Sequence, residues 1–337
     1  MHEARFFEKL EDGKVKCHLC AHECTIDPGK RGICAVRENR EGTLYSLVYG
    51  RLISGNADPI EKKPLFHFLP GTRSYSIATV GCNLQCQHCQ NADISQYPHS
   101  HDGDITGTKL TPVQVVAKAV ASGSASIAYT YTEPTIFAEF AQDTARLARE
   151  KGLRNVFVSN GFMTEASATA MADVLDGDNI DLKSFSDRFY RKVCKARLQP
   201  VLDTITRMKK LGVWVEVTTL LIPGLNDSDE ELHDIAQFLH ATGPEIPWHV
   251  TAFYPTYKLL DRPPTPLATL RRAREIGLAA GLRYVYTGNI PGDPGENTFC
   301  PGCDHLLIER SGFAIRQNRI IDGACPECGD RVDGVWR

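Results

Sequence analysis

The order of segments along the chain predicts an α/β fold, in the form of a partial (β/α)6 barrel around a parallel sheet. From about residue 72 onward, short β-branched runs alternate with amphipathic helical segments. Cysteine-rich segments without this alternation lie on both sides. We therefore expect three parts: a Cys-rich N-terminal metal-binding segment and connector over 1–71, the barrel over 72–291, and a small zinc-ribbon-like C-terminal knuckle over 292–337.

Six segments are predicted strands because they are short, apolar and rich in β-branched and aromatic residues. They are 74–80, 125–131, 155–160, 179–183, 214–222 and 248–254, and 283–289 is a candidate seventh. Residues 1–70 show no regular pattern and are expected to be irregular. In (β/α) barrels the active site lies at the carboxyl ends of the strands.

Helix boundaries between these strands carry recognisable signals. Thr111 with Gln114, and Ser228 with Glu231, have the spacing of a capping box at a helix start. A third helical segment keeps apolar residues at helical spacing and ends on Gly152. These signals predict the helices that connect parallel strands.

Composition limits the class of protein. Lys and Arg total 38 against 41 Asp and Glu, which argues against a general nucleic-acid footprint or a membrane-surface footprint. No apolar run reaches the roughly 18 residues of a membrane span, and no secretory signal is recognisable. The 12 cysteines fall into spaced groups, which predicts metal sites in a reducing, cytoplasmic setting.

Two groups contain four cysteines each. The C-terminal group has two C-x2-C pairs, typical of a structural zinc site, with a rubredoxin-like iron as the alternative. For the N-terminal group both a structural zinc and an auxiliary iron–sulfur cluster remain open. The C-terminal group is Cys300, Cys303, Cys325 and Cys328, and the N-terminal group is Cys17, Cys20, Cys24 and Cys34.

The third group has only three cysteines, Cys82, Cys86 and Cys89, spaced C-x3-C-x2-C directly after the first predicted strand of the barrel. Four cysteines saturate a [4Fe–4S] cluster, whereas three leave one iron open to a small ligand. A third structural zinc completed by a distant histidine is the alternative.

This motif resembles that of radical S-adenosylmethionine enzymes, in which the open iron binds the amino and carboxylate groups of the cofactor. Longer stretches, "DPIEKKPLFHFLPG" and "GNIPGDPGENTFCPGC", resemble the radical-SAM member of the AmmeMemoRadiSam system, which is related to pyruvate formate-lyase activating enzymes. The resemblance covers nearly the whole chain. It implies a radical SAM oxidoreductase that forms a 5'-deoxyadenosyl radical and abstracts hydrogen from an unidentified substrate.

The resemblance also implies cofactor contacts at the strand ends. In the family, a Gly-Gly-Glu-Pro run binds the amino group of S-adenosylmethionine. Here Glu133 keeps the acid, while Tyr131 and Thr132 replace the glycines; a solvated loop acid is the alternative for Glu133. A "TNG" run after the third strand is matched by Ser159 and Asn160.

The activating-enzyme "DLK" run is present as Asp181 to Lys183. Strand alternation places both charged residues on one face, where an unpaired charge inside a barrel is costly. We therefore expect Lys183 to pair with the cofactor carboxylate, and Asp181 to neutralise it or hold a cation. His88, beside the last motif cysteine, is a candidate to pack on the adenine or is a packed loop histidine.

Two contacts of the activating enzymes are missing. The arginine expected on the fifth strand is replaced by Thr218 and Thr219. No histidine follows the sixth strand, and His249 lies at a different point. These departures weaken the alternative that the chain activates a glycyl-radical enzyme.

Cys194 stands alone and is interpreted as a buried structural thiol, with a hydrogen donor or cysteine radical as the alternative. The resemblance implies S-adenosylmethionine, a donor such as flavodoxin or ferredoxin, and associated Memo-like and AMMECR-like proteins. A zinc-binding interaction module without catalysis is the competing class.

Overall fold

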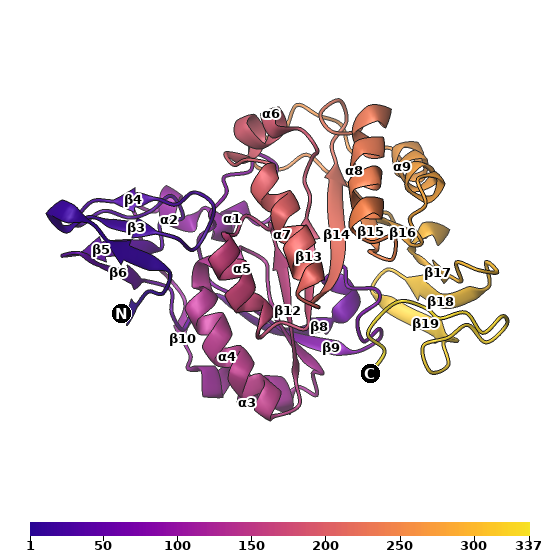
Figure 1. Ribbon diagram of the computed structural model, residues 1–337, viewed down its shortest axis with the longest axis horizontal. Helices are drawn as coiled ribbons and strands as arrows, with labels where there is room; N and C mark the ends of the chain where they lie inside the picture. Colours follow the sequence, from indigo (N-terminus) through magenta and orange to yellow (C-terminus); the bar gives the residue numbers. More distant parts are fainter.

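An eight-stranded sheet forms the centre of the molecule (Figure 1). The computed structural model describes residues 1–337. The strand order is β16-β15-β14-β13-β12-β11-β9-β8, and all neighbours pair in parallel except β8 and β9. Because the edge strands β8 and β16 do not pair, the sheet stays open. The strands are β8 (Ser54–Pro59), β9 (Arg73–Ala78), β11 (Ser126–Tyr129), β12 (Arg154–Ser159), β13 (Gly177–Asp181), β14 (Trp214–Leu221), β15 (Trp248–Ala252) and β16 (Val285–Gly288).

One longer helix lies between each two consecutive parallel strands and packs outside the sheet (Figure 1). This is the connection that parallel strands require. The predicted alternation of strands and helices is therefore confirmed. β16 corresponds to the candidate seventh strand at 283–289. The helices are α3 (Pro112–Ala121), α4 (Ala138–Glu150), α5 (Glu165–Ala172), α7 (Gln199–Lys210), α8 (Asp229–Thr242) and α9 (Leu267–Ala279).

Short helical turns fill several connections. They are η1 (Glu11–Gly13), η2 (Ile60–Lys62), α1 (Ala92–Ser95), α2 (Tyr97–Ser100), η3 (Pro134–Phe137), α6 (Asp187–Phe189), η4 (Tyr190–Cys194) and η5 (Pro294–Glu296). The η4 turn is a π-helix, a form that is rare and frequently occurs at functional sites.

The predicted helix starts are confirmed, with one correction. Thr111 caps α3 in a complete capping box with Gln114. Ser228 also caps α8 by accepting from the backbone amide of Glu231. However, the Glu231 carboxylate does not return to the cap, since it accepts from the backbone amide of Phe185 at 2.8 Å and from Ser184. The capping box predicted there is therefore wrong, because a tertiary contact uses the glutamate.

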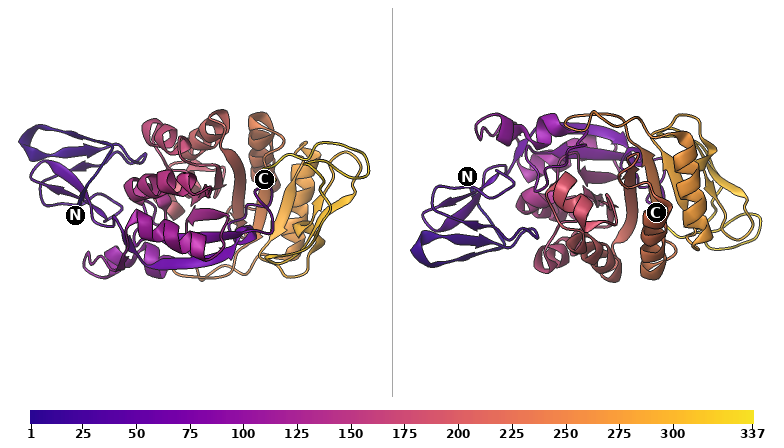
Figure 2. Two further views of the ribbon diagram at one scale, coloured as in Figure 1. Left: turned by 90° about the horizontal axis from the view of Figure 1, so that it is seen from below. Right: turned by 90° about the horizontal axis from the view of Figure 1, so that it is seen from above.

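The N-terminal segment forms two small antiparallel sheets, so the expectation of irregular structure was wrong for it. The sheets have the orders β1-β6-β5 and β2-β3-β4, and they project from one end of the molecule (Figures 1 and 2). A separate pair joins β7 to β10. The strands are β1 (His2–Glu3), β2 (Phe7–Lys9), β3 (Val15–Cys17), β4 (Thr25–Ile26), β5 (Arg37–Arg40), β6 (Thr43–Ser46), β7 (Arg51–Leu52) and β10 (Thr108–Lys109).

The C-terminal segment lies at the opposite end of the central sheet (Figure 2). Three antiparallel strands form it: β17 (Thr298–Phe299), β18 (Leu306–Ser311) and β19 (Ala314–Asn318). A separate apolar cluster joins this segment to β16 and to the connector, which is the segment between β8 and β9. The buried members of that cluster include Phe66, Tyr284, Tyr286, Leu307 and Ile308.

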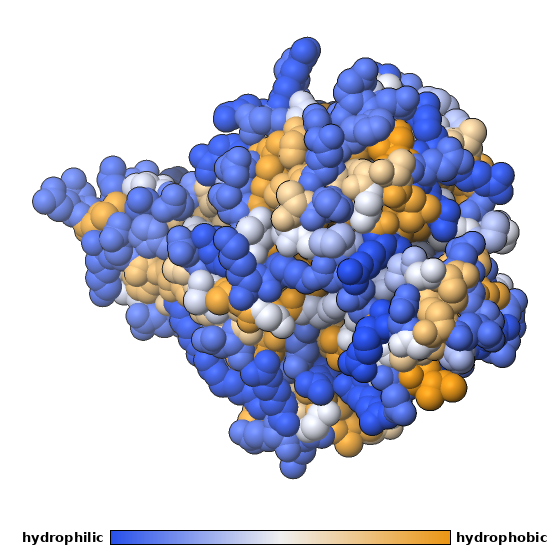
Figure 3. All heavy atoms as spheres, turned by 45° about the vertical axis from the view of Figure 1, so that its right-hand side comes forward, coloured by the Kyte–Doolittle hydropathy of each residue, from blue (hydrophilic) through white to orange (hydrophobic).

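Hydrophilic residues dominate the face seen in Figure 3, with apolar patches between them. No helix combines the length and the apolar character that crossing a membrane requires.

A buried polar network lies beneath the apolar cluster of the C-terminal segment. The Glu216 carboxylate on β14 is fully buried and accepts from the backbone amides of Phe66 and His67, at 3.0 and 2.8 Å. The indole of Trp214 donates to it at 3.0 Å, and His249 lies 2.7 Å away. One carboxylate therefore ties the connector to two strands of the sheet.

His67 is expected to make the fold sensitive to acid. The ring is fully buried between the Asp333 carbonyl and the Tyr286 hydroxyl, each at 2.6 Å, and burial lowers the pKa of His67 to about 4. Between pH 6.5 and 4 the unfolded chain binds a proton that the folded chain does not, so stability falls as the pH falls through this window. The difference between the pKa values of His67 in the unfolded and the folded chain corresponds to roughly 3 kcal/mol in the free energy of unfolding.

Denaturant unfolding at several pH values checks this prediction. Substituting His67→Asn should lower stability at pH 7 and flatten its decline between pH 6.5 and 4. Substituting the exposed His101→Asn serves as the control and should leave the decline unchanged. An identical decline in the parent and in His67→Asn would show that His67 does not titrate in this way.

Candidate functional site

The three-cysteine loop follows β9 at the carboxyl edge of the sheet. Within it, the Leu84 amide donates to the Cys82 sulfur at 3.4 Å, and Ser95 lies 3.2 Å from the Cys89 sulfur. Gly81, which begins the loop, has a φ of 98° and packs so closely on Val36 that a Cβ would lie 2.6 Å from that side chain. Only glycine fits this backbone and this approach.

Cys194 lies directly beneath this loop. The Gln85 and Gln87 amides donate to the carbonyls of Cys194 and Val193, both at 3.0 Å, so the η4 turn supports the cysteine loop. The Cys194 sulfur, the Cys86 sulfur and a His88 nitrogen lie within 4.8 Å of one another. The hydrogen bond from Cys194 lowers the pKa of Cys86, while burial raises the pKa of Cys194. Cys194 is therefore a thiol that donates to a candidate metal ligand.

His88 is buried beside this pair. Its side chain is 4% exposed and its Nδ1 atom has no hydrogen-bond partner. Burial, and then the nearby Lys183 charge, lower the pKa of His88 to about 3, so the ring is neutral. The aromatic partner is Phe189, with ring centroids 6.0 Å apart. An unsatisfied buried nitrogen beside the cysteines is a group that a bound ligand would complete.

Glu133 and Asn160 join two neighbouring strand ends to the cysteine loop. The fully buried Glu133 carboxylate accepts from the Asn160 amide at 2.8 Å, and burial raises the pKa of Glu133 to about 7. The Asn160 side chain donates to Asn83 at 2.7 Å and lies 3.8 Å from the Cys82 sulfur. Glu133 is therefore a buried connection between strand ends, not a solvated loop acid.

Tyr131, which stands where the family has a glycine, has a left-handed backbone conformation. Its φ of 65° lies in the left-handed region, which costs a residue with a Cβ roughly 1–2 kcal/mol. The Asn91 side chain donates to its carbonyl at 2.7 Å. Its hydroxyl contacts Asp58, and the Lys63 ammonium lies 4.4 Å from its ring centroid. Contacts from the connector thus hold the strained backbone in place.

Asp181 and Lys183 form a partly buried ion pair with an N···O distance of 2.8 Å. Burial alone would lower the pKa of Lys183, but Asp181, and after it Cys86 and Cys194, raise it well above its usual value. The lysine therefore stays charged beside the cysteine loop. Its side chain is 16% exposed and that of Asp181 is 36% exposed, so the pair is accessible to a small ligand.

Two expected side chains are already engaged within the protein. The Thr132 hydroxyl donates to the Thr79 carbonyl at 2.9 Å. The Ser159 hydroxyl donates to the buried Asp178 at 3.1 Å. At these two positions the backbone groups, rather than the hydroxyl groups, are available to contact a ligand.

The missing activating-enzyme contacts are not replaced from neighbouring positions. Thr218 donates to the Asn179 side chain and Thr219 to the Leu182 carbonyl, both at 2.9 Å. His249 belongs to the Glu216 network described above.

Asn83 and Glu216 are two important residues that the sequence analysis missed. Asn83 directly follows the first motif cysteine, and a polar residue there was a usable signal. Glu216 is the one charged residue in "WVEVTTLLI" (214–222), a pattern that indicates a satisfied buried charge in a strand.

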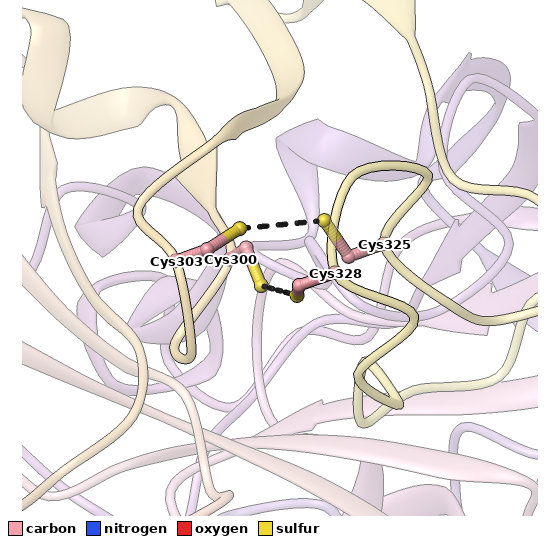
Figure 4. A group of neighbouring side chains, drawn as sticks. All are labelled: Cys300, Cys303, Cys325 and Cys328. Atoms are coloured by element: carbon pink, nitrogen blue, oxygen red, sulfur yellow. Dashed lines mark hydrogen bonds between the residues drawn. The ribbon is translucent and has the colours of Figure 1, made fainter.

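The four C-terminal cysteines converge from two turns (Figure 4). The Cys300 and Cys328 sulfurs are 3.6 Å apart, and those of Cys303 and Cys325 are 3.7 Å apart. A tetrahedron of four thiolates with metal–sulfur bonds of about 2.3 Å has edges of about 3.8 Å. The geometry therefore fits one tetrahedral metal ion.

The four N-terminal cysteines line one small cavity. Its other walls are mostly apolar and include Leu19, Ile26, Ile33 and Ile136. The structure thus brings together both predicted groups of four.

Comparison with known proteins agrees with this geometry. Residues 76–239 match the model of the Radical SAM superfamily. The chain is 48% identical over 338 residues to Uncharacterized protein MJ0808 of Methanocaldococcus jannaschii, covering 99% of this chain and 100% of that protein. It is 24% identical over 227 residues to Pyruvate formate-lyase 1-activating enzyme of Escherichia coli K12, covering 61% of this chain and 89% of that one.

A solved structure shows the same fold. SuiB of Streptococcus suis, bound to S-adenosylmethionine, superimposes with a TM-score of 0.51 at 13% identity, covering 68% of this chain and 53% of that one. The chain carries a Radical SAM domain over residues 76–239, and it belongs to the same family as the M. jannaschii protein.

A Radical SAM domain implies a [4Fe–4S] cluster and S-adenosylmethionine, and the residues present fit both. Cys82, Cys86 and Cys89 supply three thiolates on one loop. The amide of Leu84 and the side chain of Asn160 approach the Cys82 sulfur, as expected around a cluster thiolate. The charged Lys183 is available to the carboxylate of the cofactor, and the unpartnered nitrogen of His88 to one of its polar groups.

Proposed function

We propose that this chain is a radical S-adenosylmethionine oxidoreductase that removes a hydrogen atom from a substrate still to be identified. The three-cysteine loop at the carboxyl edge of the sheet, with a charged lysine beside it, carries the proposal. When bound, the cluster supplies the electron that cleaves S-adenosylmethionine and so generates a 5'-deoxyadenosyl radical. A one-electron donor such as flavodoxin or ferredoxin would supply that electron.

The protein's own residues would bind and orient the cluster and the cofactor. Cys82, Cys86 and Cys89 hold the cluster. The backbone at Tyr131 and Thr132, shaped by the Asn91 contact, would receive the amino group of the cofactor.

Several further residues are proposed cofactor contacts. Lys183 would receive the cofactor carboxylate, with Asp181 keeping it charged. Glu133 and Asn160 hold two strand ends in register with the loop, and Ser159 lies on the same edge. His88 would take a hydrogen bond at its unpartnered nitrogen.

Substituting Lys183→Met should weaken S-adenosylmethionine binding. The variant keeps most of the apolar stem and loses a charge-assisted bond that contributes roughly 1.5–3 kcal/mol. We expect a roughly ten- to hundred-fold weaker Kd by calorimetry, with iron content unchanged. The exposed Lys192→Met, on the adjacent η4 turn, is the control and should bind as the parent does. Equal affinity in Lys183→Met would leave Lys183 as only the partner of Asp181.

We further propose that Cys300, Cys303, Cys325 and Cys328 bind a structural zinc ion. The two short sulfur–sulfur distances support one ion, and tetrahedral thiolate sites are typical of zinc, with iron as the alternative. The small C-terminal sheet would then be stabilised by the metal in place of a large core of its own.

The activation of a glycyl-radical enzyme is the alternative reaction. Similarity to the E. coli activating enzyme supports it. The threonines at Thr218 and Thr219 and the engaged His249 argue against the same cofactor contacts. A zinc-binding module without catalysis is the alternative of another class, and it predicts a colourless protein after anaerobic reconstitution with iron and sulfide.

The resemblance to the AmmeMemoRadiSam system supports Memo-like and AMMECR-like proteins as candidate partners or substrates. Deuterium transfer tests this. Each deuterated candidate would be mixed with the reduced protein and S-adenosylmethionine, and 5'-deoxyadenosine analysed by mass spectrometry. Deuterium in 5'-deoxyadenosine identifies a substrate; its absence for every candidate removes these proteins as sources of the hydrogen.

A further inference from the structure

The four N-terminal cysteines form a site, and the proposed function does not say what this site binds. Cys17 ends β3, Cys20 and Cys24 lie in the turn between β3 and β4, and Cys34 precedes β5. All four line the same small cavity. Because the cavity is enclosed by two different turns and by η3 of the central layer, its shape is fixed by tertiary packing.

The spacing of the sulfur atoms distinguishes this site from the C-terminal one. All four C-terminal sulfurs lie within 4.8 Å of one another, as a single ion requires. No three of the N-terminal sulfurs lie that close together, although they face one cavity. The same wider spacing holds for Cys82, Cys86 and Cys89. A cluster places several irons and sulfides between its thiolates, so its ligand sulfurs stand farther apart than those of one ion.

A buried positive charge also faces the cavity. Arg37 lines the cavity, is 2% exposed, and has an Nε atom without a hydrogen-bond partner. Its other nitrogens bind Glu139 at 2.8 Å and the Arg5 carbonyl at 2.5 Å. A metal site with four thiolates is anionic, and the unpartnered nitrogen of this guanidinium could donate to it, while Glu139 shares the positive charge.

Backbone amides point at the sulfurs as well. The amides of His22, Ile33 and Val36 donate to Cys20, Cys24 and Cys34 respectively. Amide donors to sulfur are one of the means by which proteins adjust the potential of iron–sulfur clusters. Three such donors around one apolar cavity form an environment suited to a redox cluster.

The site also touches the radical loop. A ring nitrogen of His22 lies 2.8 Å from the carbonyl of Asn83, the residue after Cys82. The backbones of Cys20 and Met163 form an isolated antiparallel β-bridge. The Ala21 amide donates to the Phe162 carbonyl at 3.2 Å, close in sequence to Asn160 and Gly161. The two cysteine loops are therefore in direct contact through the chain.

We propose that Cys17, Cys20, Cys24 and Cys34 hold a second iron–sulfur cluster of the [4Fe–4S] class, in contact with the radical loop. This assignment does not depend on the proposed reaction, since it concerns only what the four thiolates bind.

The test uses the full-length chain with Cys82, Cys86 and Cys89 all replaced by alanine, which removes the first cluster. After anaerobic reconstitution, this variant should retain about four irons and four sulfides per chain and a reducible cluster signal in electron paramagnetic resonance. Adding Cys17→Ala, Cys20→Ala, Cys24→Ala and Cys34→Ala should remove that iron. Adding Cys194→Ala instead is the control and should leave it in place.

Cys34→Ser alone, in the same background, covers the case in which the larger variant fails to fold. It should change the resonance spectrum of the remaining cluster while the far-ultraviolet circular dichroism stays unchanged. Two zinc ions per chain and no iron in the background variant would overturn the proposal. So would iron that survives replacement of all four N-terminal cysteines. Failure of S-adenosylmethionine cleavage in the parent would instead contradict the proposed function and leave this iron count unaffected.

Discussion

Replacing Cys82, Cys86 and Cys89 together with alanine is expected to abolish reductive cleavage of S-adenosylmethionine. These are the three thiolates that the loop after β9 offers to three of the irons, so the variant would lose both the electron source and the open iron. Formation of 5'-deoxyadenosine from S-adenosylmethionine and a strong chemical reductant, measured by chromatography, should fall below detection.

The fold of this variant should survive, because the loop is also held by contacts that do not use sulfur. Amides of Gln85 and Gln87 bind the η4 turn, and the Asn83 carbonyl contacts His22. A control with Cys303→Ala and Cys328→Ala, at the other end of the molecule, should keep cleavage activity. Cleavage that persists in the loop variant while the fold is intact would sink the assignment of the radical site.

Replacing Glu216 with alanine is expected to produce the largest loss of stability from a single substitution. The change leaves the amides of Phe66 and His67 and the indole of Trp214 without an acceptor, and separates His249 from its partner. Removing one member of a buried charged network costs about 3–5 kcal/mol. Chemical denaturation at pH 7 should show a loss of this size.

The same substitution at Glu275, an exposed residue of α9, is the matched control, and it should change stability by less than about 0.5 kcal/mol. Glu216→Gln keeps one acceptor oxygen, so its loss of stability should lie between that of Glu216→Ala and that of the control. If Glu216→Ala is no more destabilising than the control, the network does not hold the connector to the sheet.

The sequence was sufficient for the central architecture because its signals are local. Alternating β-branched runs and capped helices specify strand and helix types, and α3 begins at Thr111 as its capping box requires. The small N-terminal sheets were missed because their strands are only two to four residues long, too short for a periodic pattern. The edge strand β8 was missed for a related reason: "SGNADP" has few strand-forming residues, and its place is set by pairing with β9.

The site was only partly predictable for a similar reason. Cysteine spacing is a local property, so the three groups could be recognised, whereas the pairing of Cys194 with Cys86 depends on a turn more than a hundred residues away in the chain. The left-handed backbone of Tyr131 depends on Asp58 and Lys63, which the sequence does not place beside it. Strand alternation gave the shared face of Asp181 and Lys183 and left two roles open for Asp181, and the structure shows that it pairs with Lys183.

With three cysteine ligands, the cluster is expected to have one iron open to S-adenosylmethionine. Electron–nuclear double resonance on the reduced, reconstituted protein tests it directly, with S-adenosylmethionine labelled at the amino nitrogen and carboxylate oxygens. We expect hyperfine coupling of both labels to a cluster in the parent protein and none after replacement of Cys82, Cys86 and Cys89. Bound S-adenosylmethionine that shows no coupling in the parent protein would contradict the account.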